Sequence, residues 1–331
     1  MNRIQTLAGS ILLCSHILGA EVVASYPPGT NLESIAVSPG GDLFVTSVYD
    51  GIVYDVTPSG SSRVFGQLPG IAVGVAFSSD GTLLASSIAS LYRFDASGAP
   101  SLVANIPGAV DLNGLTAFRN GTVLAADDAA ATVWQVDLKT GASHAWLSGG
   151  LLEPNSPDLP IGPNGVKVFN NAVYITNTGT GAIIRVPILA DGSAGIPSVY
   201  ASGFMLDDFA FGSDGSMFLA TQGGNSVIRL FPDGTTATIA TDADGLLGDS
   251  ALAFGRTAAD SQNIYVVNNG GAYEGLNGPG TVIRLNVGIT GVAPELQAAP
   301  EPSTLVLVGC FGLAYAMWRG RLRILRRSAR E

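Results

Sequence analysis

The stretch at residues 207–234, DDFAFGSDGSMFLATQGGNSVIRLFPDG, contains the pattern that decides the fold. Phe209 and Phe211 alternate with other residues before a Ser-Asp-Gly turn, and the apolar run 217–220 follows the turn. Short apolar runs on both sides of an Asp-Gly turn are typical of a β-hairpin. After a Gly-Gly-Asn break, residues 226–231 predict a third strand that ends at Pro-Asp-Gly. Three strands cannot bury both faces of a sheet alone, so this stretch needs neighbours.

The same order of strand, turn and strand recurs about every 40 residues along the chain. The positions that open the repeats in equivalent phase are Glu33, Val73, Asn113, Asn164, Asp207 and Ser250. The third strand recurs as well, for example as ATVWQV at 131–136 and TVIRL at 281–285. A period near 40 residues with almost no helical periodicity indicates propeller blades or a solenoid. The sequence therefore predicts six repeats in an all-β domain.

The first segment after the leader supplies the missing strand of the last repeat. EVVASYPPG at 21–29 is similar to the fourth strand of other repeats, such as RVFGQLPG at 63–70. The sixth repeat has no such strand of its own after residue 287. An N-terminal strand that completes the sixth sheet would remove its exposed edge. We therefore predict a six-bladed β-propeller over residues 21–290, with the ring closed by an N-terminal strand, and not an open solenoid.

The two ends of the chain differ from this body. Residues 1–20 carry Arg3 and then an apolar run with small residues near its end, which is typical of a secretory signal peptide. Residues 291–302 are predicted as a linker with a Pro-Glu-Pro motif, 303–318 as an apolar anchor segment and 319–331 as a basic tail. An apolar segment followed by arginines indicates a C-terminal transmembrane helix with the body outside the cytoplasm. The segment is shorter than the roughly 20 residues of a typical spanning helix.

The order of Pro-Glu-Pro, apolar run and arginine cluster over residues 300–331 resembles the PEP-CTERM sorting tail of Gram-negative bacteria. This resemblance implies that an exosortase acts on the tail. It also implies export across the inner membrane, with the chain anchored there through its C-terminus before processing. The protein would then reach the cell surface or the extracellular space. An ordinary C-terminal membrane anchor is the alternative.

The body of the chain is strongly acidic. Between residues 21 and 300, nine basic residues face 24 acidic ones. Such a surface repels nucleic acid and favours cations, so we expect no nucleic-acid partner. Cys14 and Cys310 both lie outside the body, which therefore contains no disulfide. The 47% apolar content with 43 glycines suits one large, turn-rich β domain.

The residues that open the six repeats would meet at one mouth of the central channel, because each has the same phase in its repeat. Glu33 and Asp207 bring carboxylates to this mouth, and Asn113 and Asn164 bring carboxamides. Oxygen donors of this kind are the ligands that Ca²⁺ prefers. Carboxylates packed together cost free energy unless a cation or water serves them. The sequence therefore predicts a cation site, and a mouth that holds only ordered water is the alternative.

These openings resemble those of the gluconolactonase, regucalcin and luciferin-regenerating-enzyme family of six-bladed propellers, over about residues 33–285. The resemblance implies that Glu33, Asn164 and Asp207 hold one divalent cation, with Ca²⁺ as the first choice and Zn²⁺ or Mn²⁺ as alternatives. It implies that Asn113 contacts the substrate. Asp207 would also be the catalytic proton acceptor. The implied function is metal-dependent hydrolysis of a small-molecule lactone or similar ester.

The sequence departs from that family's pattern at several positions. Ser34 and Ile35 stand where the family has Gly-Pro, and Asp208 stands where it has Gly. At the third repeat, Asp111 and Gly114 replace the family's Arg and Asp, which face the substrate. The sugar-lactone specificity is therefore not expected to transfer. The alternative function is a non-catalytic propeller of the NHL or YVTN kind that binds a polysaccharide or a protein at the cell surface.

Other catalytic arrangements find little support in the sequence. His144 is the single histidine outside the leader, which disfavours a histidine-rich zinc site and a Ser-His-Asp triad. We expect His144 at the surface of an outer strand. The loop at 153–162 lengthens the spacing between the third and fourth repeats, and it is either a substrate lid or a plain surface insertion.

Overall fold

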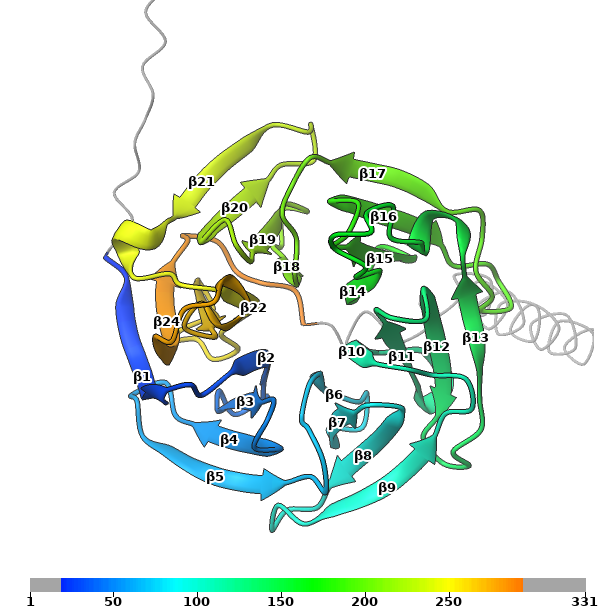
Figure 1. The fold of residues 1–331 in the computed structure, drawn as a ribbon, viewed down its shortest axis with the longest axis horizontal. Helices are drawn as coiled ribbons and strands as arrows, with labels where there is room; N and C mark the ends of the chain where they lie inside the picture. Colours follow the sequence, from blue (N-terminus) through cyan, green and yellow to red (C-terminus); the bar gives the residue numbers. More distant parts are fainter. Residues whose placement is uncertain (1–18, 294–331) are drawn as a thin grey trace, which may run out of the picture.

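The computed structural model describes residues 19–293, which form a ring of six four-stranded antiparallel sheets around a central channel (Figure 1). The predicted six-bladed β-propeller is thus confirmed. The signal peptide, the apolar anchor segment with its transmembrane helix and the basic tail were predicted for segments that lie outside the described residues. Within residues 19–293, no helix is both long enough and apolar enough to cross a membrane.

The strands of each blade follow one another outward from the channel. The innermost strands are β2 (Leu32–Val37), β6 (Val75–Phe77), β10 (Leu112–Ala117), β14 (Pro163–Phe169), β18 (Phe209–Phe211) and β22 (Asp249–Phe254). The second strands are β3 (Leu43–Ser47), β7 (Leu83–Ser87), β11 (Thr122–Asp127), β15 (Ala172–Asn177), β19 (Met217–Thr221) and β23 (Asn263–Asn268). The third strands are β4 (Ile52–Val56), β8 (Ser90–Phe94), β12 (Thr132–Asp137), β16 (Ala182–Pro187), β20 (Ser226–Leu230) and β24 (Pro279–Asn286). The outermost strands are β5 (Ser62–Gln67), β9 (Pro100–Asn105), β13 (Ser143–Ser148), β17 (Ser198–Ser202), β21 (Thr236–Ala240) and β1 (Glu21–Pro28).

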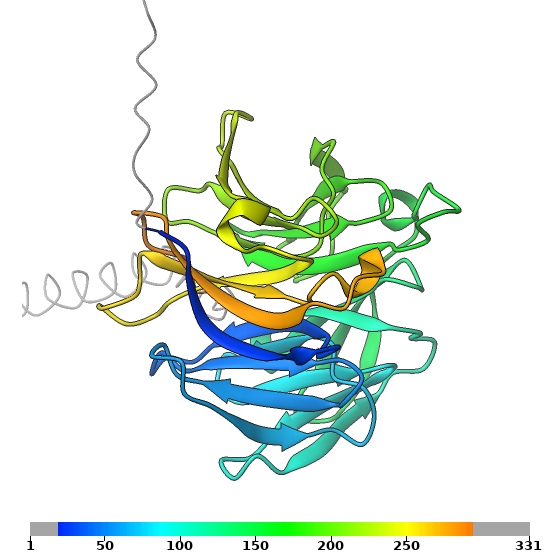
Figure 2. The same ribbon diagram turned by 60° about the vertical axis from the view of Figure 1, so that its left-hand side comes forward.

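The sixth blade combines both ends of the described chain. β1 pairs antiparallel with β24, with Glu21 opposite Arg284 and Ser25 opposite Thr281. The Arg284 guanidinium also donates a hydrogen bond to the Glu21 carboxylate. Figure 2 turns this side forward and shows β1, in dark blue, beside β24, in orange. The predicted closure by an N-terminal strand is therefore confirmed, and β24 has no exposed edge.

Apolar side chains fill the space between neighbouring blades. Successive strand residues point to opposite faces, so every sheet can pack on both sides. Phe44 lies edge-on to Phe65 at 5.0 Å and to Phe77 at 5.5 Å between ring centroids. Phe169 stacks on Phe211 at 4.2 Å between the fourth and fifth blades. The core is a ring of six apolar clusters, which leaves the channel axis to other side chains.

The two mouths of the channel differ in character. The innermost strands begin at one mouth, which we call the polar mouth because Glu33, Asn113, Asn164 and Asp207 lie there. They end at the other, which we call the apolar mouth. Of the short 3-10 helices, η1 (Arg119–Gly121) follows the end of β10, whereas the other three lie in connections on the side of the polar mouth: η2 (Gly150–Leu152), η3 (Asp242–Asp244) and η4 (Ala272–Glu274).

The last described residues lead to the apolar mouth. After β24, the chain crosses the hairpin turn of the fifth blade. The Ser213 amide donates to the Thr290 carbonyl at 2.8 Å, and the Val292 amide donates to the Phe211 carbonyl at 2.9 Å. These bonds hold Val292 in the wall of the apolar mouth.

Candidate functional site

The candidate residues sit where the innermost strands begin with irregular pairing. The ladder between β2 and β3 passes directly from Leu32 to Ile35, so Glu33 lies in a bulge. The ladders of β10 and β14 pass over Asn113 and Asn164 in the same way. A bulge turns its extra residue out of the ladder and re-aims the side chain. The repeated bulges therefore direct three side chains to the polar mouth.

Hydroxyl groups in the second strands replace the backbone bonds that the bulges lose. Thr176 Oγ1 accepts a hydrogen bond from the Gly165 amide at 2.7 Å and donates to the Asp207 carbonyl at 2.5 Å. Thr46 makes the equivalent two bonds between the first and second blades, at 2.9 and 2.6 Å. Each hydroxyl thus joins the bulge of one blade to the opening of the next. Sequence analysis missed this role, although a Ser or Thr recurs at this phase of three second strands.

Asp207 reaches the mouth by a different route from the other three candidates. β18 begins only at Phe209, so Asp207 precedes its strand instead of opening it. The Asp207 amide donates to the Ala220 carbonyl at 3.0 Å, and the Asp208 amide donates to the Ser250 carbonyl of the sixth blade at 3.2 Å. These bonds to two blades fix the backbone on both sides of the Asp207 carboxylate.

Two glycines allow neighbouring blades to approach closely at this mouth. A Cβ atom on Gly114 would lie 2.3 Å from the Asn164 carbonyl oxygen. A Cβ atom on Gly165 would lie 2.4 Å from Asp208 Oδ1 and 3.0 Å from its Cα. No side chain fits at either position without a backbone shift. The residues that follow Asn113 and Asn164 must therefore be glycines for the blades to hold their present spacing.

The structure brings all four predicted site residues to the same mouth. Glu33, Asn164 and Asp207 are only 6%, 4% and 2% exposed, and Asn113 is half-buried. Among residues 19–293, the buried acceptors Glu33 Oε2, Asn164 Oδ1 and Asp207 Oδ2 have no hydrogen-bond partner. A buried acceptor without a partner costs about 1 to 3 kcal/mol, and more when it carries charge. These three oxygens are therefore suited to a group that supplies positive charge or hydrogen-bond donors.

The two central carboxylates share a strongly perturbed environment. Burial raises the pKa of Glu33 to about 8, with a further contribution from the charge of Asp128, and the Asn113 side chain opposes the shift. Burial also raises the pKa of Asp207 well above its usual value, and the charge of Glu33 adds to the effect. Both shifts disfavour the ionised form. A cation between the two carboxylates would reverse that preference.

Asp128 is a further acidic residue at this mouth that sequence analysis missed. Asn113 Nδ2 donates a hydrogen bond to Asp128 Oδ2 at 3.4 Å. Burial, followed by the charge of Asp111, raises the pKa of Asp128 to about 7. Asp128 follows β11, in a position where the repeat pattern predicts only a turn. Its role depends on Asn113, which the pairing of β10 with β11 in the third blade places beside it.

Tyr273 on η4 is the second residue that sequence analysis missed. Its hydroxyl accepts a hydrogen bond from Asn31 Nδ2 at 3.2 Å. Burial raises the pKa of the Tyr273 hydroxyl, and the charges of Glu33 and Asp207 are among the further causes. The phenol therefore lies close to both carboxylates. The loop that carries it belongs to no repeat, so no pattern in the sequence pointed to it.

The predicted cation ligands combine two carboxylates with a carboxamide. Among residues 19–293, no three His, Cys, Asp or Glu side chains gather in an arrangement that could hold a metal ion. The predicted set has a different composition, since Asn164 contributes a carboxamide to the carboxylates of Glu33 and Asp207. Carboxamide oxygen is an ordinary ligand of Ca²⁺.

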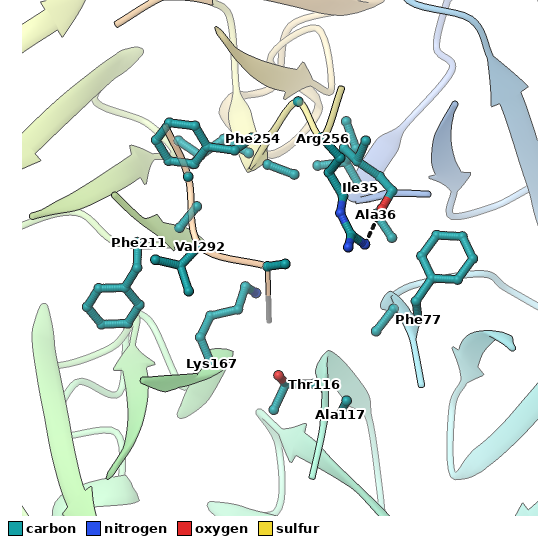
Figure 3. A pocket seen from close by; sticks show the side chains of 18 of the residues that line it. Ile35, Ala36, Phe77, Thr116, Ala117, Lys167, Phe211, Phe254, Arg256 and Val292 are labelled. Atoms are coloured by element: carbon teal, nitrogen blue, oxygen red, sulfur yellow. Dashed lines mark hydrogen bonds between the residues drawn. The ribbon is translucent and has the colours of Figure 1, made fainter. Parts of the chain in front are cut away.

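The apolar mouth contains a cavity of about 280 Å³ (Figure 3). Apolar residues such as Phe77 and Phe254 line it, and Lys167 and Arg256 point toward its centre. Lys167 Nζ contacts both carboxylate oxygens of Asp208, at 2.6 and 2.8 Å. Among the described residues that line this cavity, none has an acidic side chain. The carboxylates that could carry hydrolytic chemistry therefore lie at the polar mouth.

Two other sequence predictions can be placed. His144 is exposed on β13, as expected for a surface residue. The loop at 153–162 lies on the side of the polar mouth, where Asn177 Nδ2 donates to the carbonyls of Leu151 and Glu153 at 3.0 and 3.1 Å. The Gly179 amide donates to the Ile161 carbonyl at 2.7 Å, which fixes the other end of the loop.

Comparison with known proteins finds solved structures that share this fold. No protein-family model matches the sequence. The chain is 28% identical over 305 residues to a protein from Phoma sp named "Putative hetero-Diels-Alderase", a match that covers 74% of this chain and 85% of the relative. Regucalcin from Agrobacterium tumefaciens, a calcium-binding protein, superposes with a TM-score of 0.63 at 18% identity, covering 84% of this chain and 96% of its own. A gluconolactonase from Xanthomonas campestris superposes with a TM-score of 0.63 at 17% identity, covering 81% and 89%. At these identities the two structures show a shared fold.

Proposed function

We propose that this protein is a metal-dependent hydrolase that opens a lactone or similar ester at the polar mouth. The observation that carries the proposal is the set of buried, unpartnered oxygens from Glu33, Asn164 and Asp207. Carboxylate and carboxamide oxygens form the donor set that a hard divalent cation such as Ca²⁺ prefers. Two structures of the same fold, one a gluconolactonase and one a calcium-binding protein, support the class of activity.

The residues of the mouth can take complementary roles in ester hydrolysis. A bound cation would supply Lewis-acid polarisation of the substrate carbonyl. Asp207 accepts the proton of the attacking water as its oxygen bonds to the carbonyl carbon. The bond to the ester oxygen then breaks, and the proton passes to that oxygen. Asn113 positions the substrate, and Asp128, with a pKa of about 7, is a second carboxylate that can hold a proton near neutral pH.

The proposal is tested by assaying a lactone and ester panel after chelation and after return of Ca²⁺, Mn²⁺ or Zn²⁺. We expect hydrolysis only with a cation present. Asp207→Asn should lower kcat by about 100-fold or more, as expected for loss of a general base. Asp111→Asn is the matched control, because it removes one charge at the same mouth from a residue outside the proposed ligand set. It should keep the cation requirement.

Two results would contradict the hydrolase proposal. The first is hydrolysis that survives both chelation and Asp207→Asn. The second is an absence of hydrolysis together with tight, chelator-insensitive polysaccharide binding, which would favour the non-catalytic propeller at the cell surface.

A second candidate activity is ring formation between two unsaturated groups. The sequence match to the Phoma protein, which covers 85% of that relative, is the observation that favours it. Such a cycloaddition consumes no water and releases no acid. Product analysis by mass spectrometry therefore separates it from hydrolysis, which adds the mass of one water to the substrate.

The proposal includes export of the protein, with the apolar segment at 303–318 as its membrane anchor and the tail at 300–331 as the exosortase substrate. The signal-peptide pattern and the PEP-CTERM resemblance support this part. Cell fractionation with an antibody against the body is the test. Retention of the full-length chain in the cytoplasm would contradict export.

A further inference from the structure

Loops on the side of the polar mouth carry exposed apolar side chains, with one contributed by the loops of each blade. They lie in connections at the end where the innermost strands begin. We call the following six residues the apolar rim: Tyr49, Ile88, Val110, Leu159, Met205 and Tyr273. Their exposed fractions range from 38% for Leu159 to 70% for Tyr49. Exposed apolar residues grouped on one side of a protein indicate an interaction surface.

Tyr273 connects this rim to the carboxylates below it. Its hydroxyl accepts the hydrogen bond from Asn31, which is 2% exposed and lies two residues before Glu33. The residue as a whole remains 55% exposed, so the ring stays accessible while the hydroxyl is held inward. A molecule that touches the Tyr273 ring therefore lies near Glu33 and Asp207, whose charges act on the Tyr273 hydroxyl.

Ile88 in the apolar rim has a strained backbone conformation. It occupies the first position of a two-residue turn between β7 and β8, with φ of 54°. Glycine is the usual residue at such a position, and a β-branched side chain rarely adopts this conformation. The side chain is 53% exposed, so burial in the fold does not offset the strain. Strained residues of this kind cluster at ligand-binding sites, and an apolar contact with a bound molecule would supply the missing stabilisation.

The acidic residues inside the rim limit what can cover it. Glu33, Asp111, Asp128 and Asp207 lie at the centre of the ring of apolar side chains. The body between residues 21 and 300, with nine basic and 24 acidic residues, repels an anionic membrane surface. A small molecule with one polar end suits the arrangement better, because its polar group can enter the mouth while its body remains on the rim.

We propose that the substrate is an ester or lactone with a bulky apolar body. The carbonyl reaches Glu33 and Asp207, and the apolar body covers the rim. This inference rests on the proposed hydrolase function for the reactive group, whereas the apolar rim accounts for the rest of the molecule. It also agrees with Asp111 and Gly114, which replace the Arg and Asp expected of a sugar-lactone site.

The kinetic test compares γ-decalactone, γ-butyrolactone and gluconolactone as substrates of the full chain with saturating Ca²⁺. We expect kcat/KM to be at least about tenfold higher for γ-decalactone than for either small lactone, since its hexyl chain buries apolar surface. Ile88→Gly and Met205→Gln together should lower kcat/KM about tenfold for γ-decalactone and leave γ-butyrolactone unchanged. Ile88→Gly also relieves the strained turn, so lost activity with an unchanged or higher Tm cannot arise from unfolding. Ile196→Asn, an exposed apolar residue on the opposite side, is the control and should change neither substrate.

A binding measurement separates this inference from the hydrolase proposal. The lactam 5-hexylpyrrolidin-2-one resembles γ-decalactone but resists hydrolysis, and its affinity can be measured by calorimetry. If no lactone is hydrolysed but the lactam binds and the rim variants weaken it about tenfold, the apolar substrate class stands and the hydrolase proposal fails. The substrate class is overturned if the lactam does not bind, if the rim variants leave its affinity unchanged, or if gluconolactone is the best substrate.

Discussion

Glu33 and Asp207 are buried side by side at the polar mouth, and this placement links the proposed chemistry to stability. Each carboxylate has an oxygen without a hydrogen-bond partner among the described residues. Sequence analysis could find both residues, because each opens its repeat at the same phase. Asp128 and Tyr273 escaped it, because they lie in loops that do not repeat. Asp128 is hydrogen-bonded to Asn113 of its own blade, and Tyr273 is hydrogen-bonded to Asn31 at the start of the first blade.

In the absence of cations, the protein should lose stability as pH rises from about 4 to about 8. Burial raises the folded-state pKa of Glu33 to about 8 and those of Asp128 and Asp249 to about 7. Unfolded carboxyl groups have a pKa of about 4, so the folded protein holds these protons more tightly. The stabilisation is complete below the unfolded pKa and is lost as pH passes the folded values.

Thermal melts in chelator at pH 5 and pH 8 check this dependence, with a lower Tm expected at pH 8. Glu33→Gln should reduce the difference between the two melts, because it removes the group with the highest of the three pKa values. A Tm that rises from pH 5 to pH 8 in chelator would show that the carboxylates are not held protonated by the fold.

Thr176→Val tests the hydroxyl that joins the fourth and fifth blades. The change leaves the buried Gly165 amide and Asp207 carbonyl without their partner. We expect a loss of about 1 to 3 kcal/mol in the free energy of unfolding. In a domain of this size that corresponds to several degrees in Tm, on the order of 2 to 4 °C per kcal/mol. Thr176→Ser keeps the hydroxyl and should melt closer to the wild type, whereas identical melts for Val and wild type would exclude the role.

At the scale of the strand, the sequence predicted where the innermost strands lie more accurately than how they begin. Apolar alternation and Asp-Gly turns locate the strands. The bulges at Glu33, Asn113 and Asn164 have no such pattern, because they depend on bonds to the second strand and to the next blade. The bulges are nevertheless what aims the candidate residues at the channel.

The closing strand β1 yields a prediction of its own. Tyr26 is buried, its ring lies 4.5 Å from that of Tyr54 in the first blade, and its hydroxyl is 2.7 Å from Ser62 Oγ. Tyr26→Ala should therefore cost about 3 to 5 kcal/mol, as for other large aromatic truncations. Val22→Ala in the same strand is the matched control, since Val22 is 56% exposed and should change stability by less than about 0.5 kcal/mol.

Chemical denaturation of these two variants measures both changes in the free energy of unfolding. Equal stabilities for Tyr26→Ala and Val22→Ala would mean that β1 does not hold the first and sixth blades together through this side chain.

At the scale of the whole molecule, the ring separates two environments along one channel. The polar mouth gathers carboxylates and carboxamides, and the apolar mouth has a cavity lined by strand ends, with Lys167 and Arg256 pointing toward its centre. The six repeats could be predicted because each contains its own apolar runs and turns. Their closure could be predicted because residues 21–29 are similar to the fourth strand of other repeats. The cavity and the apolar rim could not be predicted, because they arise from connections and strand ends that come together only in the closed ring.

The central claim is that Glu33, Asn164 and Asp207 hold a divalent cation, and a thermal melt of the chelator-stripped protein titrated with Ca²⁺ tests it most directly. A ligand at about one hundred times its Kd stabilises the folded state by roughly 2.7 kcal/mol, which is readily detected. We predict that Ca²⁺ raises the Tm of the wild type and of Asp111→Asn but not that of Asp207→Asn. If Ca²⁺, Mn²⁺ and Zn²⁺ all leave the wild-type Tm unchanged, or if Asp207→Asn responds like the wild type, the cation site at the polar mouth is contradicted.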